Sequence, residues 1–250
     1  MKSNHGFTVL RNQHKDTILK TLRRHRGSGY YRTGSFSDEL IWEGRRFVFP
    51  TSDSRIGAGM WVFRSVVADV KKYLSKNPRP VELPRLPVNL WNEKLKKFRG
   101  KIAATDVDHA YWRIAFLDGV ISPKTYKRGL ELPDKSLRLA ALANLASAKE
   151  YRIISDGEIT DETKVLRFDP MHQLVYNNIR NACFGHMKNM ADMLEGDFIC
   201  YKTDCIYYRD RNGNAEKVQM YLDSVGLDWK QLVEVDKKNG DAGHKPRPPR

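Results

Sequence analysis

Five segments of the chain have the residue pattern of helices. They are residues 14–26, 59–76, 136–151, 171–194 and 216–227. In residues 59–76 the apolar positions recur every four residues, from Val62 to Leu74, which is the spacing of one helix face. The segment 171–194 carries the longest apolar stripe, and Gly196 follows it as a stop signal.

Strand patterns alternate with these helices. Residues 40–50 indicate two short strands around Glu43-Gly44, and residues 101–105 form an apolar strand that ends on acids. Residues 201–210 predict a second hairpin, with Asp204 at its turn. After residue 99 the order is therefore strand, helix, long helix, hairpin and helix, which is typical of an α+β fold with an antiparallel sheet.

Prolines and charges divide the chain into four regions. Four prolines lie between residues 78 and 87, so we expect residues 78–98 to be an extended connector. Residues 1–77 precede it, residues 99–235 form the α+β region, and the Pro/Gly/Lys-rich residues 236–250 are expected to be a flexible tail. The net charge is +14, and residues 1–100 hold 21 Lys and Arg against 8 Asp and Glu. The basic excess is therefore a property of the first hundred residues.

Basic and aromatic residues alternate in this N-terminal region. Guanidinium groups pair with phosphates and aromatic rings stack on bases, so the pattern favours a nucleic acid over a merely solvated basic surface. The candidate nucleic-acid-binding residues are Arg23, Arg24, Arg26, Tyr30, Tyr31 and Arg32.

The composition excludes several other classes. Hydrophobic residues make up 40% and charged residues 30% of the chain, and no apolar run reaches the roughly 20 residues that span a bilayer. The first residues lack the apolar core of a signal peptide. Cys183, Cys200 and Cys205 form no Cys-x-x-Cys pair, which argues against zinc and fits a reducing compartment. We therefore expect a cytoplasmic protein without a membrane partner.

Acidic residues mark the ends of two predicted strands. Asp106 and Asp108 end the strand that begins at Lys101, and Asp204 lies in the turn of the second hairpin. Adjacent strands would bring these tips together, and two carboxylates from different strands are what two-metal phosphoryl transfer requires. Asp at a strand end is also ordinary turn chemistry, so the pattern alone leaves both interpretations open.

The order of these acids resembles family B DNA polymerases. Asp106 followed five residues later by Tyr111 looks like motif A, and Lys202-Thr203-Asp204-Cys205 looks like motif C, Asp-Thr-Asp-Ser. Between them, Arg138 followed by residues 142–146 looks like motif B, a basic residue before an Asn-Ser-x-Tyr-Gly block. The resemblance covers residues 99–210, and residues 1–98 have no counterpart.

The resemblance implies a polymerase-like palm with packed helices, short fingers and a basic N-terminal region. Asp106 and Asp204, with Asp108 as a neighbour or alternative, would hold Mg²⁺ or Mn²⁺. Tyr111 would close the pocket beneath the sugar of the incoming nucleotide. The alternative interpretation is that Tyr111 is a tyrosine of the hydrophobic core. Arg138 would contact the triphosphate, where the alternative is a solvated helix arginine.

The chain departs from the family in all three motifs and in their spacing, and motif A reads His-Ala-Tyr-Trp where the family commonly has Ser-Leu-Tyr-Pro. Lys202 replaces the first acid of motif C, residues 142–146 lack Asn-Ser and Tyr-Gly, and only 26 residues separate Tyr111 from Arg138. The acids of a proofreading exonuclease would lie well before motif A, and they are not found there. The resemblance therefore implies a reduced polymerase without proofreading.

Three functions follow as hypotheses. The first is a minimal template-directed DNA polymerase of a virus or mobile element, acting in DNA replication. Its partners would be a DNA primer-template and dNTPs, with a terminal protein or another replication subunit as a further partner. The second is a catalytically degenerate, polymerase-like protein that binds nucleic acid. The third is a primase or a reverse transcriptase-like enzyme, because those enzymes place two acids on a similar sheet.

Overall fold

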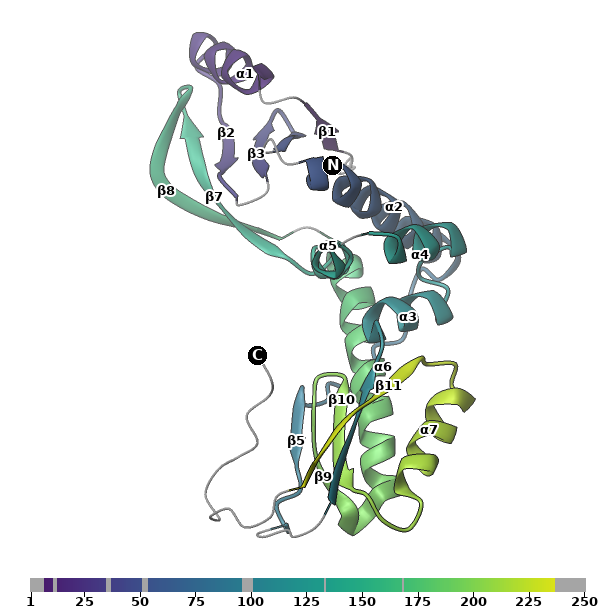
Figure 1. Ribbon diagram of the computed structural model, residues 1–250. Coiled ribbons are helices and arrows are strands. Elements are labelled where there is room, and N and C mark those ends of the chain that lie inside the picture. The colour runs from purple at the N-terminus through teal and green to yellow at the C-terminus, as the bar shows by residue number, and fades with distance from the viewer. Residues whose placement is uncertain are drawn as a thin grey trace. The chain divides into compact units, whose positions relative to one another are not determined.

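The computed structural model describes residues 7–10, 13–34, 37–50, 54–95, 101–132, 134–167 and 169–236 (Figure 1). The chain divides into two compact units. Unit 1 consists of residues 1–76 and 127–176, and unit 2 of residues 77–126 and 177–250. Each unit contains one sheet, and the sheets are antiparallel except for one parallel pair, β1 with β4.

Unit 1 is built on a six-stranded sheet in the order β1-β4-β3-β2-β7-β8. The strands are β1 (Phe7–Val9), β2 (Gly29–Arg32), β3 (Ser37–Trp42), β4 (Arg45–Pro50), β7 (Ala148–Ser155) and β8 (Glu158–Arg167), and the helices are α1 (Gln13–Arg24), α2 (Ser54–Lys76) and α5 (Lys135–Ala143). Leu22 of α1 packs with Leu40, Phe49 and Ile154 of the sheet, so α1 covers one sheet face. The β3–β4 turn lies at Glu43-Gly44, as predicted, and both residues have positive φ.

Unit 2 is built on a five-stranded sheet in the order β11-β6-β10-β9-β5. The strands are β5 (Asn89–Trp91), β6 (Lys101–Val107), β9 (Phe198–Lys202), β10 (Cys205–Arg209) and β11 (Trp229–Asp236). The helices are α3 (Ala110–Leu117), α6 (Pro170–Leu194), the short η1 (Glu195–Asp197) and α7 (Asn214–Ser224). The chain passes from one unit to the other within α4 (Pro123–Leu130) and again within α6. Figure 1 shows α6 and α7 along one face of this sheet, with apolar side chains such as Met187 and Leu222 fully buried.

The α+β fold class is confirmed, and so are most of the predicted elements. The segment 136–151, predicted as one helix, is different: α5 ends at Ala143 and the chain enters β7 at Ala148. Pairing of β7 with β2 and β8 overrides the helical preference of the Ala/Leu-rich sequence. The strands β8 and β11 were not predicted. The tail from residue 237 lies outside the described residues.

The predicted domain boundary at residue 78 falls where the chain passes from unit 1 to unit 2. Residues 127–176, which the sequence grouped with the palm-like region, belong to unit 1. The proline-rich connector is held by a side-chain amide of α6. Asn178 Oδ1 accepts a hydrogen bond from the Leu83 backbone N–H at 2.9 Å, and its Nδ2 donates to the Val81 carbonyl at 2.7 Å. Among the described residues, no helix has the length and apolar character that crossing a membrane requires.

Candidate metal and nucleotide site

The strand register of unit 2 places Asp106 and Asp204 next to each other along the backbone, where the end of β6 meets the start of β10. β6 and β10 are antiparallel, and Asp106 lies opposite Cys205, the residue after Asp204. The Val107 N–H donates to the Asp204 carbonyl at 2.9 Å, which ties the hairpin turn to the end of β6. The expectation that adjacent strands bring these tips together is met at the level of the backbone.

Two residues with left-handed backbone conformations flank the acids. Thr203 has φ 54° immediately before Asp204, and His109 has φ 54° immediately after Asp108. A positive φ is unfavourable for a β-branched residue such as threonine, and such strain is often found at functional sites. The Thr203 N–H donates to the Val88 carbonyl at 2.9 Å, which holds this turn in place.

A lysine that sequence reasoning missed binds two of the predicted acids. Lys230 Nζ lies 2.9 Å from Asp106 Oδ2 and 2.9 Å from Asp108 Oδ1. Hydrogen bonds and charge attraction from both carboxylates raise the pKa of Lys230, against a small opposing effect of burial. The sequence signal that could have found Lys230 is the alternation of apolar and polar residues from Val233 to Asp236. These residues belong to β11 (Trp229–Asp236), which places Lys230 opposite Asp106.

The middle of α6 lies next to Asp204 and Tyr111. Burial first, and the nearby charge of Asp204 second, raise the pKa of Cys183. The next residue, Phe184, makes an edge-to-face contact with Tyr111 of α3 at 6.3 Å between ring centroids. The Arg180 guanidinium lies 5.6 Å from the Phe184 ring centre. The Arg180 cation and the rings of Phe184 and Tyr111 therefore meet along one short stretch of α6, and Asp204 lies close enough for its charge to act on the neighbouring thiol of Cys183.

This stretch of α6 also matches the motif B pattern better than α5 does. Residues 181–185 read Asn-Ala-Cys-Phe-Gly, against the pattern Asn-Ser-x-Tyr-Gly, while residues 142–146 share none of its fixed positions. Arg138 of α5 is only 4% exposed, and its guanidinium donates to the Gly129 carbonyl at 3.4 Å. Its side chain is therefore part of the interior of unit 1 and is not presented to a triphosphate.

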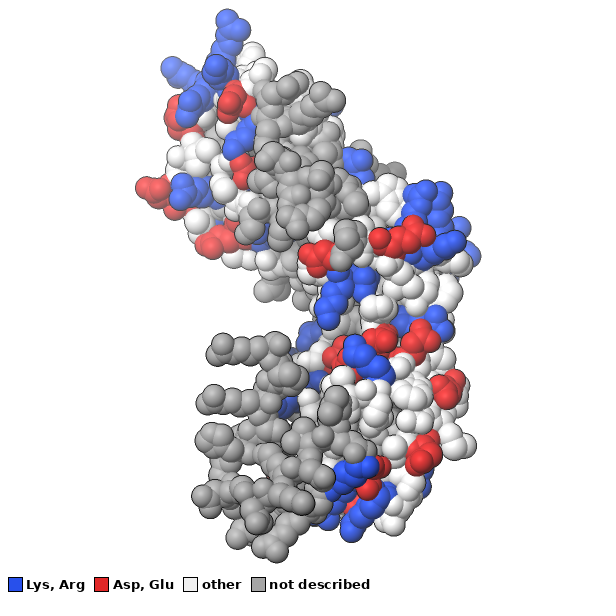
Figure 2. All heavy atoms as spheres, in the orientation of Figure 1, with Lys and Arg blue, Asp and Glu red and all other residues white. Residues whose placement is uncertain are grey.

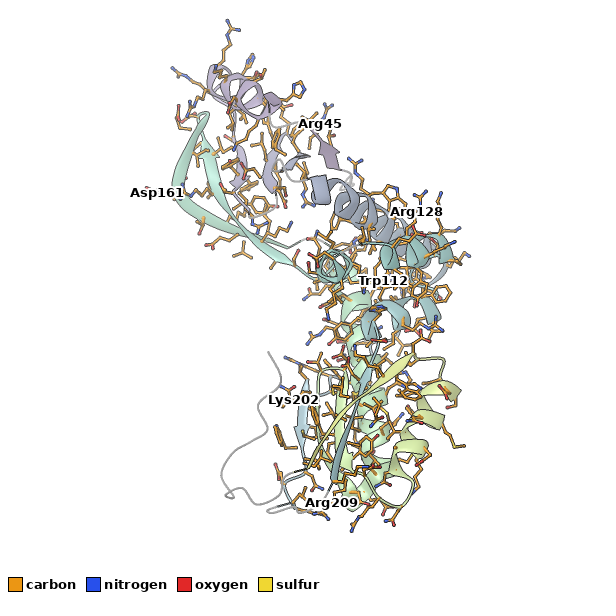
Figure 3. All side chains as sticks on the ribbon, in the orientation of Figure 1. Arg45, Trp112, Arg128, Asp161, Lys202 and Arg209 are labelled. Carbon is orange, nitrogen blue, oxygen red and sulfur yellow. The ribbon has the colours of Figure 1, made fainter. Side chains whose placement is uncertain are left out.

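The Lys202 side chain of β9 points toward the neighbouring strand β5 and away from β10. Its ammonium lies 5.2 Å from the ring centre of Trp91 on β5, the neighbour of β9 opposite to β10 (Figure 3). The strand register places Lys202 and Asp106 on the same sheet face, with Cys205 between them. Burial raises the pKa of Cys205 to about 12, and the charges of Asp106 and Asp204 act in the same direction. Both carboxylates thus lie near this thiol.

The predicted nucleic-acid-binding residues separate into three places in unit 1. Arg23 and Arg24 end α1 and Arg26 follows in the turn, all three exposed. Figure 2 shows Lys and Arg side chains gathered over α1. Strand alternation then places Tyr30 and Arg32 on one face of β2 and Tyr31 on the other. Tyr31 is buried beneath α1 and donates a hydrogen bond to Asp38 Oδ2, so its ring is not offered to a base.

The carboxylates of Asp106 and Asp204 are candidate ligands for a divalent cation. Among the described residues, no group of three His, Cys, Asp or Glu side chains is arranged to hold a metal ion. Mg²⁺, however, is usually held by one or two carboxylates together with water and substrate phosphates. Two Asp side chains from adjoining strand ends fit that requirement, provided that the ammonium of Lys230 moves away from Asp106. Half of the Lys230 side chain is exposed, so solvent offers it an alternative position.

Comparisons with known proteins give no relative. No family model matches the chain, and no curated protein or solved structure is similar to it.

Proposed function

We propose that the protein is a minimal, template-directed DNA polymerase in which Asp106 and Asp204 hold Mg²⁺ or Mn²⁺. One observation carries this proposal: the register of β6 against β10 sets these two acids at adjoining strand ends, beside a strained turn. A primer 3′-hydroxyl would lose its proton and attack the α-phosphate of a dNTP, and the bond to the β-phosphate would break with release of pyrophosphate. Divalent cations held by Asp106 and Asp204 would activate that hydroxyl and compensate the phosphate charge.

The neighbours of the acids support roles for two further residues. Tyr111, held against Phe184, would lie beneath the sugar of the incoming nucleotide. Arg180 provides a cation on α6 close to these rings, and it replaces the buried Arg138 as the proposed triphosphate contact. Motif B is accordingly assigned to residues 181–185. An Arg180→Ala variant is expected to raise the KM for dNTP more than it lowers kcat, because the contact would already form in the bound substrate.

A second function is favoured by the ion pairs of Lys230. A lysine that engages Asp106 and Asp108, with Lys202 in place of an acid, suits a polymerase-like protein that binds nucleic acid without catalysis. In that case the ammonium substitutes permanently for a metal. The two functions differ in whether purified protein incorporates nucleotides.

Primer extension distinguishes them. The purified chain, a primed DNA template, dNTPs and either Mg²⁺ or Mn²⁺ should give extended primer. Asp106→Asn and Asp204→Asn should abolish extension while the folded state, followed by circular dichroism, is retained. Asp192→Asn is the matched control, since Asp192 is an exposed residue of α6 paired only four residues away with Lys188.

Extension that survives Asp204→Asn would remove the proposed site. No extension by the unaltered protein with either metal, together with intact DNA binding, would establish the non-catalytic function. Extension on RNA templates, or synthesis on unprimed DNA, would instead identify a reverse transcriptase-like enzyme or a primase.

A further inference from the structure

The sheet of unit 1 ends on a long strand, β8, that pairs with β7 alone among the described residues. β8 runs over ten residues, Glu158–Arg167, whereas the edge strand β5 of the other sheet has three. Figure 1 shows β8 as the outermost strand of its sheet. A long edge strand offers a row of backbone N–H and C=O groups to a further strand.

The turn between β7 and β8 determines which backbone groups face β8. The two turn residues, Asp156 and Gly157, both have positive φ, which is the geometry of a two-residue hairpin. Such a hairpin closes on a hydrogen-bonded pair, here Ser155 and Glu158. Alternate residues of β7 therefore direct their N–H and C=O toward β8, and Tyr151 is one of them.

The outward groups of β8 follow from this pattern. Lys164 is paired with Tyr151, so its backbone groups face β7. The backbone groups of Thr163 and Val165, on either side of it, therefore point away from the sheet. The pairing shifts by two residues of β8 before Thr163, and an even shift leaves the alternation of side chains between the two faces unchanged.

The side chains of β8 carry charges in a fixed order. Asp161 and Glu162 come first and Lys164 follows, and all three are exposed. Asp161 lies at the outer edge of the hairpin (Figure 3), and Val165 is 58% exposed. Charges on an edge strand usually prevent pairing with another strand. In this order, however, the acids and the cation would attract each other if β8 met a second copy that runs in the opposite direction.

One symmetric register satisfies both the backbone and the charges. Outward backbone groups have to meet outward groups, so the two-fold axis must pass through a residue and not between two residues. An axis at Glu162 or Lys164 would set that charge against its own copy, which is destabilising. An axis at Thr163 sets Glu162 opposite Lys164 twice, on the same face, and Thr163 opposite Thr163.

We propose that β8 pairs with β8 of a second copy of this chain, antiparallel about a two-fold axis at Thr163. The interface is self-complementary, as a two-fold interface has to be. Addition of a strand to an open sheet edge supplies the backbone hydrogen bonds, and the two Glu162–Lys164 pairs select the register. The inference does not rest on catalysis by Asp106 and Asp204, and it stands if unit 2 is inactive.

Sedimentation velocity of the full-length protein, freed of nucleic acid, measures the association. We expect a monomer–dimer equilibrium between about 1 and 100 μM, the range in which a dimer of micromolar affinity dissociates. Asp204→Asn should associate as the unaltered protein does. This separates failure of the inference from failure of the polymerase proposal.

Charge exchange tests the register. Glu162→Lys replaces two attractive pairs by two repulsive ones and should weaken the dimer roughly tenfold or more. The double variant Glu162→Lys with Lys164→Glu should restore association, because each pair again joins opposite charges. Glu131→Lys is the matched control: Glu131 is an exposed residue of unit 1 that follows α4, and the change in net charge is the same.

A cysteine at the two-fold axis reads the register directly. Thr163→Cys should form a disulfide with its own copy under mild oxidation, because the Cα atoms of a hydrogen-bonded pair are about 5.5 Å apart. Val165→Cys should not, since its two copies would be separated by four residues, about 13 Å. The natural cysteines are buried, and the unaltered protein under the same oxidant controls for them. Non-reducing electrophoresis detects the product.

Four results would overturn the inference. They are a monomer at every concentration, an unaltered dimer in Glu162→Lys, no recovery in the double variant, and equal cross-linking of Val165→Cys and Thr163→Cys. Circular dichroism of each variant checks that the sheet is intact.

Discussion

The two sheets of this protein use carboxylates in opposite ways. In unit 1, Glu39 has 4% of its side chain exposed and is surrounded by three cations. In unit 2, Asp106 and Asp108 have 23% and 37% of their side chains exposed and share the single cation Lys230. In these ion pairs, several cations meet one carboxylate at Glu39, whereas two carboxylates meet one cation at Lys230.

This difference indicates which site is available for ligand exchange. A buried ion pair is costly to separate, because each partner left behind keeps its charge in a poorly solvated place. A half-exposed lysine can leave its carboxylates for water at little cost. The carboxylate of unit 1 therefore acts as a fixed part of the fold, whereas the half-exposed ammonium of Lys230 can leave Asp106 and Asp108 for water.

The largest expected effect is at Glu39. Glu39→Gln leaves Arg46 and Lys149 buried without their counter-charge, and we expect it to destabilise unit 1 by about 3–5 kcal/mol. Urea unfolding followed by circular dichroism measures the loss. The control is Glu150→Gln, an exposed residue of the same sheet that accepts a hydrogen bond from Thr163, with an expected cost below about 0.5 kcal/mol.

The cysteines report whether this loss stays within unit 1. Cys183, Cys200 and Cys205 are buried, free thiols, and all three belong to unit 2. Burial raises their pKa values, so they should react slowly with thiol reagents while unit 2 is folded. Thiols of Glu39→Gln that react as soon as the circular dichroism signal falls would show that the two units unfold together.

Acidification should remove the stability that the ionised Glu39 carboxylate contributes to the folded protein. Burial opposes ionisation of Glu39, but Arg46 and Lys149 outweigh it and lower the pKa from 4.5 to about 2. A lowered pKa in the folded state contributes stability above the unfolded value, and this contribution disappears as pH falls from about 4.5 to about 2. This difference in pKa corresponds to about 3 kcal/mol of unfolding free energy. Thermal unfolding across this pH range measures it. Glu39→Gln should flatten the dependence; an unchanged slope in that variant would assign the effect to other acids.

A smaller effect is expected at the exchangeable cation of unit 2. Lys230→Met removes the ammonium from Asp106 and Asp108, and we expect the affinity for Mn²⁺ to rise about tenfold, equivalent to about 1.4 kcal/mol. Calorimetric titration with MnCl₂ measures it without reference to activity. Lys217→Met removes a charge from an exposed position of α7 and is the control. Equal affinities in Lys230→Met and the unaltered protein would mean that the acids do not hold a metal.

The smallest effect is at the strained turn beside Asp204. Thr203→Asn keeps a polar side chain but tolerates the positive φ, and it should stabilise unit 2 by about 1 kcal/mol. Thr163→Asn, at a β8 position paired with Arg152, should destabilise the protein, since asparagine is disfavoured in strands. Thermal unfolding of both variants tests the strain directly, and a loss of stability in Thr203→Asn would contradict it.

Local periodicity was enough to predict much of the fold. The long helix α6, the β3–β4 turn and the β9–β10 hairpin each depend on patterns within one short segment. Strands β7 and β8 form a hairpin with each other and were missed because the Ala/Leu-rich residues before β7 favour a helix through its first residues. Strand β11 was missed because its partner, β6, lies far away in the chain. The same holds for the candidate site: Asp106 and Asp204 followed from the ends of predicted strands, but Lys230 needed the unpredicted strand β11.

The sequence by itself determined the residue types at the turns, the helical stripes and the alternation that separates Tyr30 from Tyr31. Only the tertiary structure decided which charges meet, because charge pairing depends on strand register between distant segments. It set Lys230 against Asp106, enclosed Glu39 among three cations and buried Arg138. A one-residue change of register would have moved Lys230 or Glu39 to the other face of its sheet.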